Sequence, residues 1–173
     1  IDLDKTININ EPKVIFLGGR PGVGKTAFAI NILANIGLKQ NIPVLMLNLE
    51  ESKEKIINRI ISKETQFDIS KIKSNELNDL EKIKVQDTRK LIENSKIFIE
   101  DTNISSLNKI IELIRKYVKE YEVRFIALDY LQLIDFKLSS DRKIENILWK
   151  LREISYELKI TILSDDCKLS VAI

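Results

Sequence analysis

Near its amino end the chain reads Gly19-Arg20-Pro21-Gly22-Val23-Gly24-Lys25-Thr26, which satisfies every fixed position of the pattern G-x-x-x-x-G-K-[S/T]. Glycines are needed in such a loop because phosphate oxygens must approach backbone N–H groups closely, and a Cβ would block that approach. The apolar run Val14–Leu17 precedes the loop, and a segment of helical period follows it. A buried strand, a glycine-rich turn and the amino end of a helix are the context in which this pattern binds phosphates.

This loop, a P-loop, predicts a binding site for ATP and Mg²⁺ that comprises every residue from Gly19 through Thr26. Lys25 would reach the β- and γ-phosphates, and the Thr26 hydroxyl would complete the coordination shell of Mg²⁺. The partial positive charge at the amino end of the following helix would also favour the phosphates. A glycine-rich turn that binds nothing is the alternative, and the flanking strand and helix argue against it.

Short apolar runs alternate along the chain with longer segments of helical period. The runs that we expect to form strands, buried on both faces, are Val14–Leu17, Val44–Leu49, Ile97–Ile99, Phe125–Leu128 and Thr161–Leu163. A first helix is expected from Lys25 through Ala34, ending by Gly37, and Ser52 is expected to cap the next one. This alternation predicts an α/β fold with a mostly parallel central sheet flanked by helices.

Length and composition limit the classes of protein to which the chain can belong. Its 173 residues suit one α/β domain, and a net charge of +2 makes no case for nucleic-acid binding. A single cysteine excludes an internal disulfide and fits a reducing compartment, and together with the lack of histidine it argues against a zinc site. Because no apolar stretch reaches the roughly 18 residues of a membrane span, we expect a cytoplasmic protein without membrane contact.

Two acidic residues at strand ends are candidates for the chemistry of nucleotide hydrolysis. Asp129 closes an apolar strand, where a P-loop enzyme places the carboxylate that holds the water shell of Mg²⁺. Glu50 follows another strand, and parallel strands direct their carboxyl ends at the ligand crevice, so Glu50 could orient or deprotonate the attacking water. Glu50 and Glu51 could equally complement the dipole of a helix amino end, and spacing alone leaves both interpretations open.

Several further blocks of sequence are distinctive. They are Asp2-Leu3-Asp4-Lys5, Asn48-Leu49-Glu50-Glu51-Ser52 with Arg59 downstream, Phe67-Asp68-Ile69-Ser70-Lys71-Ile72, Ile97-Phe98-Ile99-Glu100-Asp101-Thr102 and Leu128-Asp129-Tyr130-Leu131-Gln132-Leu133. With the Arg-Pro pair inside the P-loop, these blocks resemble the ATPase core of the DnaB-type replicative DNA helicases. The resemblance runs from about Asp2 to Ser164, and its last block is far more specific than the P-loop itself.

This resemblance implies a RecA-like fold, assembly into a homo-hexamer, and ATP hydrolysis that drives translocation along single-stranded DNA. It makes Lys25, Glu50 and Asp129 the catalytic set, with Glu50 as the catalytic carboxylate. Thr26 and Asp129 become the residues associated with Mg²⁺. Primase and a helicase loader are implied as partners of the full protein.

Two departures from the family pattern bear on activity. After the strand Thr161–Leu163 the family has Ser-Gln, whose glutamine senses the γ-phosphate, whereas this chain has Ser164-Asp165-Asp166. Asp165 either occupies the sensor position or lies in a solvated loop. The family also continues beyond Ile173 with DNA-binding loops and a basic finger, and it carries an amino-terminal domain. We therefore expect residues 1–173 to form one partial RecA-like domain that hydrolyses ATP slowly by itself.

The sequence leaves two other functions open. A different RecA-like ATPase, such as a recombinase or a clock-type protein, would share the fold, although the Asp-Tyr-Leu-Gln-Leu block argues against it. A degenerate or truncated nucleotide-binding module with little turnover, acting as a scaffold or partner-binding protein, is favoured by Asp165 and Asp166. Turnover stimulated by single-stranded DNA would separate the motor from the scaffold, because nucleotide binding alone would not.

Overall fold

The computed structural model describes residues 11–20, 22–74, 76–101, 104, 106–129 and 140–166, excluding the side chains of residues 140–144 and 165–166. Its centre is a five-stranded sheet with the strand order β1-β5-β4-β2-β3. The strands are β1 Lys13–Gly18, β2 Val44–Asn48, β3 Ile97–Asp101, β4 Phe125–Asp129 and β5 Thr161–Asp166. All their pairings are parallel, which confirms the predicted sheet and the five predicted strand positions.

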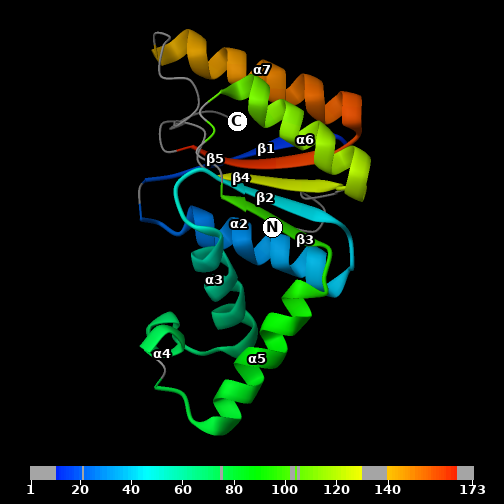
Figure 1. The fold of residues 1–173 in the computed structure, drawn as a ribbon. Helices are drawn as coiled ribbons and strands as arrows, with labels where there is room; N and C mark the ends of the chain where they lie inside the picture. Colours follow the sequence, from blue (N-terminus) through cyan, green and yellow to red (C-terminus); the bar gives the residue numbers. More distant parts are fainter. Residues whose placement is uncertain are drawn as a thin grey trace.

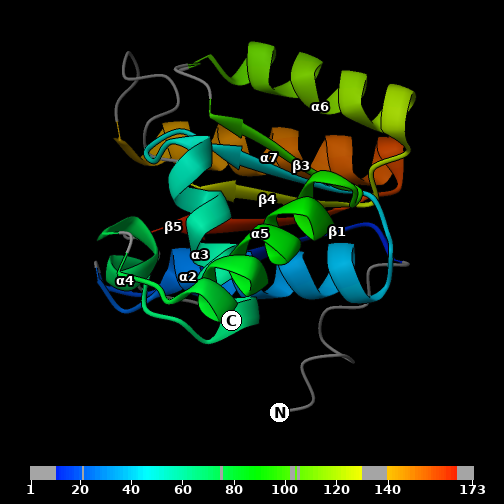
Figure 2. The same cartoon turned by 60° about the horizontal axis from the view of Figure 1, so that its bottom comes forward.

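Helices cover both faces of this sheet (Figure 1). One face carries α2 Lys25–Ala34, α3 Lys53–Thr65 and α5 Asp79–Glu93, with the short α4 Ile69–Ser74 between the last two. The opposite face carries α6 Leu107–Tyr121 and α7 Ser140–Leu158. The rotated view in Figure 2 likewise places α2 and α6 on opposite sides of the strands. No helix within the described ranges has the length and apolar character needed to cross a bilayer.

Alternate side chains of each strand enter two separate apolar cores. On β2, Val44 and Met46 pack with α2 and α3, whereas Leu45 and Leu47 pack with α6 and α7. All these side chains are at most 1% exposed. This two-sided burial explains why the strands read as continuous apolar runs in the sequence.

The first α-helix, α2, spans Lys25–Ala34 as predicted, although helical winding continues past Gly37 in π-helical form. The chain passes from α2 into the π-helical segment η1 Asn35–Lys39, with Gly37 buried inside it. A Cβ built on Gly37 would lie 2.3 Å from Cγ1 of Ile97 and 3.0 Å from Cγ2 of Val44. The glycine therefore permits close packing of this turn on β2 and β3, rather than stopping the helix.

Ser52 occupies the N-cap position of α3, as predicted, but its side chain forms no capping hydrogen bond. Its backbone carbonyl accepts hydrogen bonds from the N–H groups of Lys55 and Ile56 instead. The resemblance block Asp2–Lys5 and residues 130–133 of the most specific block lie outside the described residues. The fold therefore stands independently of those two blocks.

Candidate nucleotide-binding site

The carboxyl ends of the parallel strands meet at one edge of the sheet, and the predicted site residues gather there. Asn48 on β2 is in register with Asp129 on β4 and with Asp101 on β3. Asp165 on β5, the strand beside β4, is in register with Leu17 on β1, just before the P-loop. One row across the sheet thus joins residues that are far apart in sequence, because parallel strands align their ends.

The backbone of the P-loop has the geometry that its glycines predict. Gly22 and Gly24 adopt φ angles of +79° and +93°, which residues with a side chain rarely adopt. No atom lies within 4 Å of a Cβ built on either residue, whereas a Cβ on Gly19 would lie 3.0 Å from Cγ2 of Val23. The backbone at Gly22 and Gly24 is therefore open and free of side chains, as a phosphate cradle requires. Pro21, another predicted contact, lies outside the described residues.

Lys25 begins α2 and folds back over the loop. Its Nζ donates hydrogen bonds to the backbone oxygens of Gly19, at 3.0 Å, and Arg20, at 3.3 Å. The next residue, Thr26, is half-buried in the first turn of the helix. A cation, a hydroxyl and the positive end of a helix thus lie together beside the glycine-rich backbone.

Asp129 lies on the same face of the sheet as α2. Phe125 and Ala127, which share a face of β4 with Asp129, belong to the apolar core beneath α2. Asp129 is 3% exposed, and its backbone oxygen accepts a hydrogen bond from the N–H of Leu49 at 2.8 Å. Its carboxylate has no hydrogen bond or ion pair with any described residue. A buried carboxylate without a protein partner is the kind of group whose charge a bound cation can balance.

Glu50 lies in the short loop between β2 and α3, which other side chains hold in place. The Oδ1 atom of Asn48 accepts hydrogen bonds from the backbone N–H groups of Glu50 and Glu51, both at 2.8 Å. The carboxylate of Glu51 accepts two hydrogen bonds from Arg59, one from Nε at 3.1 Å and one from Nη2 at 2.7 Å. The side chain of Glu50 is exposed and makes no such contact within the described part of the chain.

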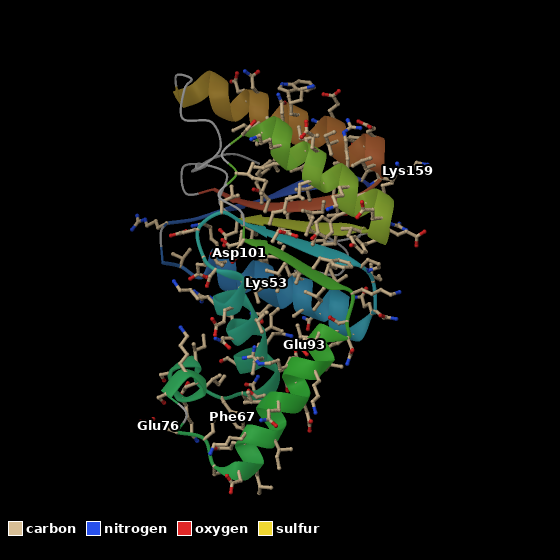
Figure 3. The ribbon with its side chains drawn as sticks, viewed as in Figure 1. Lys53, Phe67, Glu76, Glu93, Asp101 and Lys159 are labelled. Atoms are coloured by element: carbon tan, nitrogen blue, oxygen red, sulfur yellow. The ribbon has the colours of Figure 1, made fainter. Side chains whose placement is uncertain are left out.

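A third contact fixes the point where this loop enters α3. The backbone N–H of Lys53 donates a 2.8 Å hydrogen bond to Oδ2 of Asp101, and Figure 3 shows these two residues side by side. Asp101 comes from the end of β3, so the start of α3 is tied to the neighbouring strand. The backbone of the loop is thus anchored by Asn48 of β2 and Asp101 of β3, and the Glu51 side chain by Arg59 of α3. The Glu50 carboxylate remains unengaged by described residues.

The two acids of the Glu50-Glu51 pair therefore have different surroundings. The sequence patterns point to Glu50 but to no separate role for Asn48, Arg59 or Asp101, which occur only inside the blocks of family resemblance. Asn48 could have been recognised as a site residue because it is a polar residue at the end of an otherwise apolar strand. Nothing in the local pattern pairs Arg59 with Glu51, since that contact depends on how α3 packs.

Asp165 and Asp166 belong to a strand. β5 extends through Asp166, past the predicted end at Leu163, and pairs with β1 along its whole length. The alternative that these aspartates lie in a loop is therefore wrong for their backbone. Their side chains lie outside the described residues, so the sensor interpretation of Asp165 stays a prediction.

The donor set suits Mg²⁺ that arrives with a nucleotide. In the described ranges no cluster of three or more His, Cys, Asp or Glu side chains could hold a metal ion. Mg²⁺ sites of phosphate-transferring enzymes need only one or two carboxylates, because substrate phosphates and waters complete the shell. Asp129, with the hydroxyl of Thr26 at the start of α2, fits that requirement.

Comparison with known proteins identifies the family. The family model described as "DnaB-like helicase C terminal domain" matches residues 1–167. A probable replicative DNA helicase from Trieres chinensis is 33% identical over 160 residues, which cover 91% of this chain and 34% of that protein. Replicative DNA helicase DnaB from Buchnera aphidicola is 31% identical over 166 residues, covering 93% and 36%. The chain thus spans about a third of the length of these curated relatives.

Solved structures share the overall fold described above. A structure described as a DnaB-like replicative helicase and its interactions with primase has a TM-score of 0.82 and 26% identity, covering 91% of this chain and 40% of that one. A solved ATPase domain has a TM-score of 0.80 and 26% identity, covering 92% and 57%. These similarities confirm the predicted RecA-like fold. The chain belongs to the family of DnaB-like helicase C-terminal domains.

Proposed function

We propose that this chain is the ATP-binding and ATP-hydrolysing motor of a hexameric replicative DNA helicase, which unwinds duplex DNA by translocating on single-stranded DNA. Membership of the helicase family over residues 1–167 supports the motor function. The observation that carries the proposal is the open glycine backbone of the P-loop, with Lys25 at its end and Asp129 on the same face of the sheet.

ATP would bind through the described P-loop residues together with Pro21. The backbone N–H groups of the loop would hold the phosphates, and Lys25 would exchange its contacts with Gly19 and Arg20 for the β- and γ-phosphate oxygens. Thr26 and Asp129 would hold Mg²⁺. When bound, the ion would neutralise charge that develops on the transferred phosphoryl group.

Glu50 is the proposed catalytic carboxylate, which would orient the attacking water and take up its proton. Its exposure and its lack of a described partner support this role, since a base must reach substrate. Glu51 is unsuited to that role because Arg59 already occupies both its oxygens. The anchored backbone of the loop would hold Glu50 at a fixed place at the sheet edge.

The partners follow from the relatives. DnaB helicases among the curated relatives support DNA as the substrate, whereas a homo-hexamer as the assembly rests on the family resemblance. One similar structure is described as interacting with primase, which supports primase as a partner; a helicase loader rests on the resemblance alone. The role in DNA replication that the relatives' names give supports a cytoplasmic location without a membrane partner. The near-neutral charge of this chain means that DNA contacts must come from particular residues.

A titration of ATP in the presence of Mg²⁺ tests the site. We expect Lys25→Ala to weaken ATP binding by about 10- to 150-fold, because a charge-assisted contact contributes roughly 1.5–3 kcal/mol. Lys39→Ala is a matched control, since Lys39 is exposed at the far end of the same helical segment. Unchanged affinity in a folded Lys25 variant would remove the basis of the site. In the full protein, turnover that single-stranded DNA fails to raise would favour the scaffold function instead.

A further inference from the structure

Asn48 has a buried amide that is only half used. The side chain is 1% exposed, and its Nδ2 is the sole buried side-chain nitrogen or oxygen without a hydrogen-bond partner in the part of the chain that the structure describes. Leaving a buried donor unsatisfied costs free energy, so native proteins rarely do so without a reason. A bound molecule that accepts from this nitrogen is one such reason.

The orientation of this amide is determined by its neighbours. The side-chain oxygen accepts from two backbone N–H groups, those of Glu50 and Glu51, both at 2.8 Å. Turning the amide over would set its NH₂ group against two other donors, which would lose both hydrogen bonds. The nitrogen must therefore be the atom without a partner, and it carries two hydrogens to donate.

This donor lies in the row of residues that forms the proposed nucleotide site. Asn48 shares a face of β2 with Val44 and Met46, which belong to the core beneath α2, so it lies on the P-loop side of the sheet. Its register neighbours in that row are Asp129 and Asp101. The carboxylate of Asp101 already accepts from Lys53, whereas that of Asp129 has no described partner. An unused donor and an unused carboxylate therefore end adjacent strands.

We propose that Asn48 is a positioning residue that links the bound nucleotide to the Glu50 loop. Its Oδ1 holds the backbone of Glu50 and Glu51, and its Nδ2 donates a hydrogen bond to a phosphate oxygen or to a water held beside Asp129. One planar amide thus connects the ligand to the backbone that carries Glu50. This inference rests on the proposed nucleotide site and adds a residue to it.

The side-chain amide signals of ¹⁵N-labelled residues 1–173 test this link directly. The Asn48 signal is assigned through its loss in Asn48→Ser. Asn58 of α3 is the internal control, because it is also a buried asparagine, 6% exposed. Its Oδ1 accepts a 3.3 Å hydrogen bond from Arg89 of the neighbouring helix α5. On addition of Mg²⁺ and a non-hydrolysable ATP analogue, we expect the Asn48 NH₂ protons to shift and to exchange at least tenfold more slowly. The Asn58 signal should stay in place.

Backbone amides of Gly22 and Gly24 report separately whether nucleotide is bound. If these amides shift while the Asn48 NH₂ signal does not, the link is wrong and the nucleotide site remains. If no P-loop amide shifts, the nucleotide site itself is wrong, and the link falls with it. The two failures are therefore distinguishable in one spectrum.

Affinity measured with the same two asparagines gives a second test. We expect Asn48→Ser to weaken binding of the Mg²⁺-loaded analogue by about tenfold, because a shorter side chain cannot reach both the loop and the ligand. Asn58→Ser should bind as the unaltered protein does. Equal affinity of the two folded variants would contradict the proposal, whereas a loss confined to Asn48→Ser supports it.

Discussion

Arg59 of α3 and Glu51 of the loop after β2 form a two-point ion pair, with contacts of 3.1 Å and 2.7 Å. The side chains are 35% and 21% exposed, so solvent screens the pair and its contribution to stability is small, about 0–1 kcal/mol. Its geometric effect is larger, because it ties the residue next to Glu50 to a packed helix. We expect this pair to matter for turnover more than for folding.

Arg59→Lys tests that expectation. Lysine keeps the charge but cannot form two parallel hydrogen bonds with one carboxylate. We expect kcat for ATP hydrolysis to fall by several-fold to about 100-fold, since small misplacements of a catalytic group are costly, while ATP affinity stays within about twofold. The control is Arg115→Lys, because Arg115 makes a similar two-point pair with Glu157 between α6 and α7. An equal effect of both variants would mean that the Arg59 pair has no special role.

Glu50→Gln separates binding from chemistry. Glutamine preserves the size and hydrogen bonding of the side chain but cannot accept the proton of the attacking water. Turnover in the full protein should therefore fall by about 10²–10⁴-fold, with ATP affinity retained. Paired measurements of kcat and of ATP binding by titration decide the matter. Unaltered turnover, or parallel losses in both quantities, would make Glu50 a helix-end acid without a catalytic role.

Asp165→Gln examines the departure from the family at the end of β5. A carboxylate at the sensor position would repel the γ-phosphate, whereas glutamine would donate a hydrogen bond to it. We expect tighter ATP binding by the variant at constant ionic strength. Asp166→Asn, one residue further along β5, is the matched control for a general change in charge. If both variants bind ATP as the unaltered protein does, Asp165 is not a sensor.

Gly37→Ala should destabilise the fold although alanine favours helices. The added Cβ would lie 2.3 Å from Cγ1 and 2.9 Å from Cδ1 of Ile97. Overpacking of this kind costs about 1–3 kcal/mol, which exceeds the roughly 1 kcal/mol that alanine gains over glycine in a helix. Urea denaturation measures the change. In an Ile97→Ala background, Gly37→Ala should cost less unfolding free energy than it does in the parent chain. The truncated side chain at position 97 leaves room for the methyl group.

The phenol of Tyr117 should lose its proton at a higher pH than an ordinary tyrosine does. Burial raises the pKa of its phenol above the ordinary value of about 10, and the hydrogen bond that it donates to Glu100 and the charge of that carboxylate raise the pKa further. The unfolded chain then loses this proton before the folded one does. Stability from Tyr117 is thus complete below about pH 10 and is lost as the pH rises toward the folded pKa.

An ultraviolet titration checks this behaviour. Tyr117→Phe should remove a tyrosine that ionises above the ordinary range, and it should reduce the loss of unfolding free energy between pH 9 and pH 11. The comparison must be made against the parent chain at each pH, since other groups titrate in that range. A parent chain whose tyrosines all ionise near pH 10 would contradict the assigned environment of Tyr117.

The sequence by itself determined the features that depend on neighbouring residues. The P-loop pattern, the five apolar runs and the strand-end positions of Glu50 and Asp129 are local, and the positive φ angles of Gly22 and Gly24 agree with the loop's glycine pattern. The alternation of runs and helical segments predicted the parallel sheet, because only covered strands read as unbroken apolar stretches.

Only the tertiary structure decided which of these residues meet. The register that sets Asn48 beside Asp129, the pairing of Arg59 with Glu51 and the contact of Gly37 with Ile97 join elements that are distant in sequence or depend on helix packing. The local pattern predicted that the α-helix ends by Gly37, and it does, but the π-helical turn that follows and its close packing on β3 appear only in the structure. Close packing and hydrogen bonding across the sheet edge depend on the relative positions of whole elements, and no short stretch of sequence contains that information.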